Sequence, residues 1–309
     1  VVFNYGLFSF NTPNFIFRFS LGETDYQLGA TDYERFAAEY AFFGRSVWQQ
    51  TLNLTDEEKT ELIRLLQENY RPENRVYRYN FFYDNCATRP RDKIEESIAG
   101  KVIYPAEPQD GSLTFRDIVH QYCKGHPWAR FGIDLCIGSE ADQPITQRQM
   151  MFAPFYLMDA FDGAQIKGDS IQRPLITANE LIVDATPEPD ESDWMPTPLQ
   201  CSLLLFILTA AATIYGIRRR TGLWGIDLFL FGIAGIVGCV LAFLALFSQH
   251  PAVSSNFLLL VFHPGQLLFL PYIIYCVRKG KKCWYLTLNL AVLTLFIVLF
   301  PVIPQRFDF

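Results

Sequence analysis

Long apolar stretches alternate with short basic clusters in the last third of the chain, and this pattern constrains the fold most. The stretches are Leu199 to Ile217, Leu223 to Phe247, Phe257 to Val277 and Cys283 to Ile303. Each has the roughly 20 residues that a helix needs to cross about 30 Å of hydrocarbon. The pattern excludes a wholly soluble protein and predicts a domain of four transmembrane helices over residues 199–303.

The basic residues predict how these helices are oriented. From Leu199 onward the chain has eight basic and two acidic residues, and the basic ones are concentrated in 218–220 and 278–282. Cationic loops stay in the cytoplasm, so both clusters face inward. We therefore expect an inner-membrane protein with residues 1–198 and a tail, 304–309, in the periplasm of a Gram-negative cell.

The residues before the first stretch carry eighteen basic and thirty acidic side chains. This acidic balance, without a basic stripe, argues against nucleic acid as a partner. Residues 1–183 mix strand-like and helix-like patterns, which predicts an α+β domain. The acidic, proline-rich stretch 184–198 is predicted to tether this domain to the membrane.

Several local signals predict particular elements in the first domain. The alternating segments 1–10 and 15–19 predict a β-hairpin. Capping boxes at Thr31 and Thr55 each predict the start of a helix, and a further helix is expected over 114–123.

Cys86 stands where a strand-like run, 75–83, leads into a helical one, 84–98. A thiol at a helix start can be activated by backbone N–H groups and the helix dipole, which lower its pKa. Pro90 disfavours helical geometry at Arg89, so the regular helix is expected to begin near Thr88 or Arg89. The alternative is that Cys86 is inert packing, the commoner role of a buried cysteine.

The other cysteines and histidines give no metal-binding pattern. CxxC and HxxxH pairs are absent, so we expect neither a metal nor another cofactor. Cys123 and Cys136 could form a disulfide or stay free.

Polar residues also occur near the outer end of the third apolar stretch. Asn256 and His263 are candidates for a lipid or substrate contact, and Pro264 interrupts the helix beside them. The alternative for His263 is a structural hydrogen bond between helices.

Four segments resemble the Lnb family of lipoprotein N-acyltransferases of Bacteroides relatives: Asn4 to Phe15, Gly22 to Tyr26, Phe82 to Arg89 and Phe131 to Asp134. The most specific is Tyr-Asp-Asn-Cys-x-Thr-Arg, residues 83–89. The resemblance implies a circularly permuted papain or NlpC/P60-like thiol domain followed by a membrane domain. It also implies that Cys86 is the nucleophile, supported by Asp84, Asn85, Thr88 and Arg89.

The family's catalytic histidine lies in a Gly-His segment before the Asn4-Tyr5-Gly6 strand. The resemblance therefore implies a histidine upstream of Val1, with His120 and His126 as the alternatives within these residues. The candidates for the third member of a catalytic triad are Asp84, Asn85, Asp25 and Glu23, and the sequence does not favour one of them.

The function implied is transfer of an acyl chain from a phospholipid, through a thioester on Cys86, to the α-amine of a diacylglyceryl-modified lipoprotein cysteine. The alternatives are a membrane-anchored NlpC/P60-like cysteine peptidase or amidase acting on the cell wall, and a non-catalytic sensor. An apolar path leading from Cys86 would favour the lipid reaction, and a polar cleft would favour the cell wall. The sequence does not predict the donor lipid, the chain position or the oligomeric state.

Overall fold

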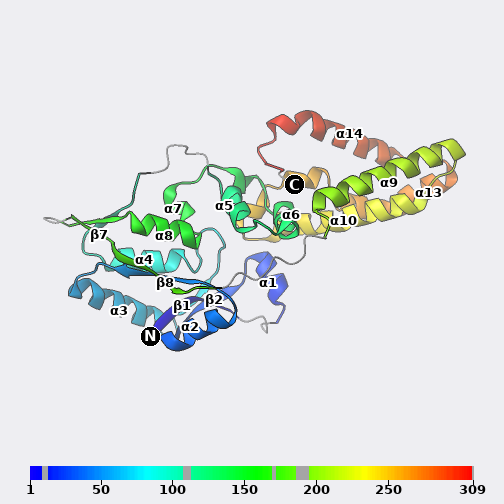
Figure 1. Cartoon of the computed structure of the whole chain (residues 1–309). Helices are drawn as coiled ribbons and strands as arrows, with labels where there is room; N and C mark the ends of the chain where they lie inside the picture. The colour runs from blue at the N-terminus through cyan, green and yellow to red at the C-terminus, as the bar shows by residue number, and fades with distance from the viewer. Residues whose placement is uncertain (9–12, 107–112, 169–171, 186–194, 308–309) are drawn as a thin grey trace. The chain divides into compact units, whose positions relative to one another are not determined.

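The structure is a computed structural model that describes residues 1–8, 13–106, 113–168, 172–185 and 195–307 (Figure 1). It contains two compact units. Unit 1 comprises Val1–Ile118 and Pro144–Glu191, and unit 2 comprises Val119–Gln143 and Ser192–Phe309. Most of the predicted tether, residues 186–194, lies outside the described residues.

Unit 1 contains three small antiparallel sheets with mixed helix and strand content, as the sequence predicts. The strand orders are β1-β2-β4, β3-β8 and β5-β6-β7. The strands are β1 (Val2–Leu7), β2 (Asp25–Thr31), β3 (Val47–Leu52), β4 (Val76–Arg78), β5 (Lys101–Ile103), β6 (Gln165–Lys167), β7 (Gln172–Pro174) and β8 (Ile176–Val183).

The helices of unit 1 follow several of the expected signals. They are α1 (Phe15–Leu21), α2 (Tyr33–Phe42), α3 (Asp56–Tyr70), α4 (Thr88–Ser97), the start of α5 (Phe115–Tyr122), α7 (Gln147–Met150) and α8 (Pro154–Asp162). The capping box at Thr55 is confirmed, because the side chains of Thr55 and Glu58 each accept from the other's backbone N–H. At α2, by contrast, Asp32 is the N-cap and its side chain makes no capping hydrogen bond.

The predicted hairpin is wrong in its second half, because Phe15–Leu21 forms helix α1 and the partner of β1 is β2. Asn14 and Gly22 flank α1 with left-handed φ angles of 56° and 74°. Such residues redirect the chain at both ends of a short helix. Alternation over only five residues does not separate a strand from a short helix.

Two apolar clusters among the described residues contribute to the interior of unit 1. One joins β3, β8 and the β5-β6-β7 sheet to α4 and α8, with Ile166 and Leu175 fully buried. The other lies at the β1-β2-β4 sheet and consists of Tyr5, Tyr26, Leu28 and Tyr77. Tyr26 and Tyr77 of this cluster lie near the thiol described below.

Unit 2 contains the membrane helices. In the described part of the chain, three helices are long and apolar enough to span a bilayer, namely α9 (Pro198–Arg219), α10 (Trp224–Phe247) and the segment Trp284–Val302. That last segment comprises α14 (Trp284–Leu299) and the 3₁₀ turn η3 (Phe300–Val302). A capping box at Thr197 begins α9.

The third apolar stretch is not the single helix that the sequence predicts. It is divided into η2 (Phe257–Leu260), α12 (Gly265–Leu268) and α13 (Leu270–Lys279), after a short helix α11 (Pro251–Ser254). Pro264 and Pro271 lack the N–H that a continuous helix needs. The side-chain amide of Gln266 donates to the Val261 carbonyl at 2.7 Å, which satisfies backbone at the break.

A segment expected in the first domain belongs to unit 2 instead. It contains the end of α5, α6 (Pro127–Cys136) and the turn η1 (Ser139–Asp142). The Gly138 N–H donates to the Ala252 carbonyl at 2.7 Å, and the Asn256 side chain donates to the Leu135 carbonyl at 2.7 Å. Any Cβ at Gly138 would lie 2.5 Å from the Ser255 oxygen, so only glycine permits this approach.

Candidate active site

Cys86 lies between a closed loop and the first turn of α4. Asn80 and Asp84 exchange backbone hydrogen bonds of 2.9 and 3.0 Å, which close the loop before the cysteine. Helix α4 begins at Thr88, as Pro90 predicts. The Cys86 residue is exposed while its neighbours Asn85 and Ala87 are buried, so the loop and the helix present the thiol at the surface.

Asn85 fixes this turn through all four of its side-chain hydrogen bonds. Its Oδ1 accepts from the N–H groups of Ala87 and Thr88 at 2.8 and 3.0 Å. Its Nδ2 donates to the carbonyls of Phe81 and Phe152, both at 2.9 Å. The amide thus ties the loop, the helix start and a distant segment together, which makes Asn85 a positioning residue.

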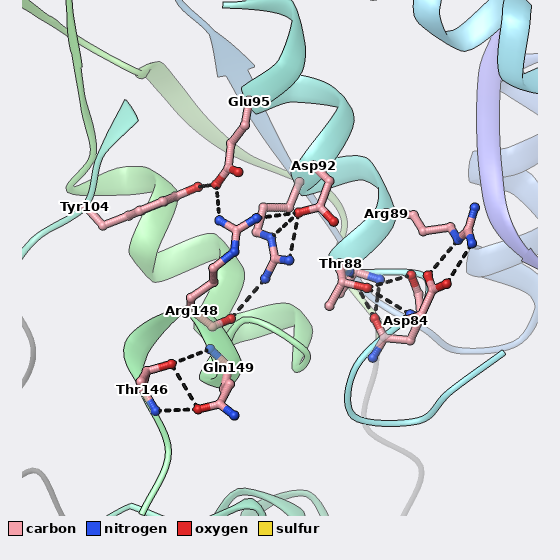
Figure 2. A network of polar contacts seen from close by, with 12 residues as sticks. Asp84, Thr88, Arg89, Asp92, Glu95, Tyr104, Thr146, Arg148 and Gln149 are labelled. Carbon is pink, nitrogen blue, oxygen red and sulfur yellow. Dashed lines mark hydrogen bonds and ion pairs between the residues drawn. The ribbon is translucent and has the colours of Figure 1, made fainter. Parts of the chain in front are cut away.

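Arg89 braces Asp84 rather than facing open solvent. Its Nε and Nη2 donate to the two carboxylate oxygens of Asp84, each at 2.7 Å (Figure 2). The guanidinium carbon lies 3.9 Å from the centre of the Tyr77 ring. The bidentate pair and the ring contact hold the first turn of α4 against the β1-β2-β4 sheet.

A second ionic network lies further along α4. Arg148 pairs with Asp92 and Glu95, each at 2.7 Å, and Tyr104 donates to Glu95 (Figure 2). Burial opposes ionisation of Glu95, but hydrogen bonds from Arg148 and Tyr104 outweigh it and lower the pKa. This network therefore fixes the body of the helix that carries the thiol at its start.

Tyrosines from the sheet surround Cys86. Burial raises the pKa values of Tyr26, Tyr77 and Tyr79, and the negative charge of a Cys86 thiolate raises each of them further. On β1, a Cβ at Gly6 would lie 3.6 Å from the Cys86 Cβ. The phenols thus stay neutral at physiological pH beside the thiol.

The surroundings raise the pKa of the Cys86 thiol instead of lowering it as expected from the helix start. Desolvation by neighbouring groups is the larger cause, and the cysteine's own backbone N–H opposes it. The N–H groups of Ala87 and Thr88, which were expected to stabilise a thiolate, bond to the Asn85 side chain. Ionisation of Cys86 therefore calls for a base.

A stack of aromatic rings extends from the tyrosines beside Cys86 to α1. Its successive members are Tyr79, Tyr26, Phe8, Phe15 and Phe19, with ring centres 4.0, 4.8, 5.5 and 6.1 Å apart. The planes of neighbouring rings differ by 16° to 25°. This ring stack gives the site a continuous apolar wall that sequence spacing did not reveal.

A cavity of about 420 Å³ lies between the β1-β2 strands and α2. Its lining includes Asn4 and Leu7 of β1, aromatic residues of α2, and the charged residues Arg35, Glu39 and Arg45. The Asn4 Oδ1 and the Cys86 Cβ both lie within 3.6 Å of the Cβ position of Gly6. Asn4, which lines the cavity, and Cys86 therefore both lie next to Gly6 of β1.

The remaining histidine candidates of the first domain lie in unit 2, whereas Cys86 lies in unit 1. The His120 Nε2 lies 2.8 and 2.9 Å from the carboxylate oxygens of Asp134, a buried residue. His126 is the N-cap of α6 and makes no capping hydrogen bond with its side chain. The Asp134 carboxylate thus fixes the orientation of the His120 ring within unit 2.

The two candidates for a lipid contact have structural partners in unit 2. The Asn256 Oδ1 accepts from the Leu258 N–H at 3.0 Å, in addition to the bond from Asn256 to Leu135. The His263 Nε2 lies 3.3 Å from the Asn289 Oδ1, a contact between the broken segment and α14. These contacts correspond to the structural alternative considered for His263.

Within the part of the chain that the structure describes, no group of three or more histidine, cysteine or acidic residues could hold a metal ion. Cys123 and Cys136 are both free cysteines. Among the triad candidates, Asp25 pairs with Arg78 at 2.8 Å and Arg18 at 3.4 Å, while Asp84 pairs with Arg89.

Together these features define a membrane protein with a mixed α and β domain that presents a cysteine at a helix start. Residues 1–120 match the family model of the Lnb N-terminal periplasmic domain, and residues 190–309 match that of the Lnb transmembrane domain. The chain therefore belongs to the Lnb family, as the sequence motifs predict. No curated protein and no solved structure matches it.

Proposed function

We propose that this protein is a lipoprotein N-acyltransferase that works through a thioester on Cys86. The observation that carries the proposal is the exposed thiol, held by Asn85 at a helix start and bordered by the ring stack. Membership of the Lnb family supports the same reaction class. The ring stack beside the thiol favours a lipid substrate over a cell-wall peptide.

The reaction has two steps in this proposal. The Cys86 thiolate attacks the ester carbonyl of a phospholipid, the ester C–O bond breaks, and the lysophospholipid leaves with a proton. The α-amine of the diacylglyceryl-modified lipoprotein cysteine then attacks the thioester, an amide forms, and the thiol is released. An imidazole accepts the thiol proton in the first step and the ammonium proton in the second.

We assign the base role to a histidine because the pKa of Cys86 is raised and the thiol is protonated at neutral pH. The family resemblance puts this histidine ahead of the strand that contains Asn4. Among residues 1–309, His120 and His126 are the alternatives, and the Asp134 carboxylate contacts the His120 ring. The fold proposed for unit 1 is a permuted papain-like thiol domain.

The donor is proposed to be a phospholipid on the outer leaflet of the inner membrane. The cavity beside β1 is lined by aromatic residues and by the exposed Arg35, Arg45 and Glu39, and its two basic residues against one acidic residue suit an amphiphilic anion. We assign the phosphate to this cavity and the acyl chain to the ring stack. Asn256 and His263 are proposed as secondary contacts of lipid with the membrane domain.

The proposed topology follows from the two basic clusters, which lie between α9 and α10 and between α13 and α14. With both clusters in the cytoplasm, the broken segment 257–279 returns the chain across the membrane. Helix α13 has 10 residues and spans only about 15 Å by itself, so η2 and α12 complete the crossing. The C-terminus and unit 1 then share the periplasmic side.

The test is mass spectrometry of the full chain reconstituted in phospholipid vesicles. An acyl mass is expected on the peptide that contains Cys86, followed by transfer to a synthetic diacylglyceryl lipopeptide. Cys86→Ala should lose both products, and Cys123→Ala, a matched change at another free cysteine, should keep them. Acyl transfer that persists in Cys86→Ala refutes the proposal.

A further inference from the structure

Helix α1 exposes apolar side chains to an extent that water does not favour. It contains Phe15, Ile16, Phe17, Phe19 and Leu21 within seven residues, and none of its residues is buried. The exposed fractions are 79% for Ile16, 55% for Phe17 and 39% for Phe19. Helices that are apolar on most sides are normally covered by protein or by lipid.

The charges of α1 do not oppose contact with lipid. The helix has no acidic residue, and its one basic residue is Arg18. The Arg18 guanidinium donates to the Glu23 carbonyl at 3.1 Å and pairs with Asp25 at 3.4 Å. Arg18 therefore holds the helix to the start of β2 while the apolar side chains stay exposed.

The ring stack makes α1 continuous with the thiol site. Phe15 and Phe19 belong both to α1 and to the stack, whose far end, at Tyr26 and Tyr79, lies beside Cys86. A ligand that covers α1 and a substrate that reaches Cys86 would therefore contact the same apolar surface. A hydrocarbon chain is the ligand that fits both ends of it.

We propose that α1 is the membrane-contacting element of unit 1, and that its apolar side chains insert into the phospholipid acyl region. The chain is already anchored by the spans of unit 2, so a bilayer is always within reach of the same molecule. The donor acyl chain leaves the leaflet at α1 and packs along the ring stack toward Cys86. This last step rests on the proposed acyltransferase function, whereas insertion of α1 does not.

The test of insertion uses tryptophan fluorescence of the full chain in vesicles of phosphatidylcholine and phosphatidylglycerol. Ile16→Trp puts the probe on α1, and Ile63→Trp is the matched control on α3, where the side chain is 53% exposed. Interfacial helices reach about 5–10 Å into the headgroup and acyl boundary, so bromines on the upper acyl carbons should quench the added emission. The emission of the unsubstituted chain, which has five tryptophans, is subtracted.

We expect bromolipid to quench the tryptophan at position 16 and to leave the one at position 63 unchanged. Equal emission from position 16 in brominated and unbrominated lipid overturns the proposal. The proposal is also overturned if bromolipid does not quench the tryptophan at position 16 but its shielding from water grows with the number of protein molecules per vesicle. In that case a second copy of the chain covers α1.

A kinetic measurement tests the access route separately. Ile16→Glu should raise the apparent KM for donor lipid at low surface concentration and leave kcat unchanged, whereas Ile63→Glu should alter neither. An unchanged KM in Ile16→Glu overturns the exit of the donor chain from the leaflet at α1. If bromolipid quenches the tryptophan at position 16 but Cys86 is never acylated, insertion of α1 is supported and only the proposed acyltransferase function is refuted.

Discussion

Replacement of Asn85 by aspartate tests whether the side-chain amide positions Cys86 as the structure shows. At an ordinary helix N-cap, asparagine and aspartate are nearly equivalent, because only the acceptor oxygen is used. Here the Nδ2 group also donates to the carbonyls of Phe81 and Phe152, both at 2.9 Å. A carboxylate cannot donate these bonds, so Asn85→Asp should destabilise unit 1.

The expected size follows from the four bonds. The buried hydrogen bond to Phe152 and the partly buried one to Phe81 lose their donor, at about 1–3 kcal/mol each. The Ala87 and Thr88 N–H groups would donate to a carboxylate instead of an amide oxygen, and these charge-assisted hydrogen bonds would recover about 1–2 kcal/mol of the lost stability. The net loss is about 2–3 kcal/mol, and for a domain of 150–250 residues this lowers the Tm by roughly 4–12 °C.

The assay is thermal unfolding of the full chain in detergent, followed by the near-ultraviolet signal of the tyrosine-rich unit 1. Asn53→Asp is the matched control, because the Asn53 amide makes one exposed hydrogen bond, to the Pro174 carbonyl at 3.0 Å. That variant should change stability by less than about 0.5 kcal/mol. Equal Tm values for the two variants would refute the positioning role of Asn85.

Three further outcomes are expected. Alkylation of Cys86 by iodoacetamide, followed on its peptide by mass spectrometry, should accelerate with a midpoint above that of a free cysteine peptide measured beside it, because desolvation raises the pKa of the thiol; a midpoint at or below that of the free peptide would contradict this. Burial of Glu58 favours its neutral acid, but hydrogen bonds from backbone N–H groups and a guanidinium outweigh burial and lower the pKa of the carboxyl. The ionised Glu58 therefore stabilises the fold above about pH 4.3, and this stabilisation is lost in more acidic solution. Glu58→Gln should therefore lower the Tm at neutral pH and flatten its decline in acid, and an unchanged acid profile would count against the assignment. In unit 2, Gly238→Ala should lower the Tm by the equivalent of about 1–3 kcal/mol, because its Cβ would lie 2.4–2.6 Å from the His263 backbone, whereas Gly232→Ala, whose nearest neighbour is at 3.9 Å, should not.

The sequence predicted best where a short stretch of chain determines its own geometry. The capping box at Thr55 and the restriction that Pro90 places on Arg89 both act within four residues, and the structure confirms the helix starts that they predict. The membrane helices α9, α10 and α14 follow from composition and length. Family membership was likewise predicted from short motifs around Cys86.

The rest depended on contacts between residues far apart in the sequence. The ring stack joins Phe8 to Tyr79 through Tyr26, and no local pattern brings these three together. The Asn85 side-chain amide donates a hydrogen bond to the distant Phe152 carbonyl, and desolvation raises the pKa of the Cys86 thiol; neither follows from the local sequence. Short alternation at α1 suits a strand and a helix equally, so tertiary packing decides the outcome.

The segment Val119–Gln143 has a practical consequence for dissecting this protein. A truncation after residue 183, the boundary that hydropathy suggests, would retain this segment but remove the carbonyls and amides of 251–256 and Gln305 to which it bonds. We expect the truncated fragment to expose apolar side chains of α6 that have lost their packing partners, and therefore to aggregate even if the rest of it folds. A chimaera that joins unit 1 of one family member to unit 2 of another should fold only when residues 119–143 come from the same protein as unit 2.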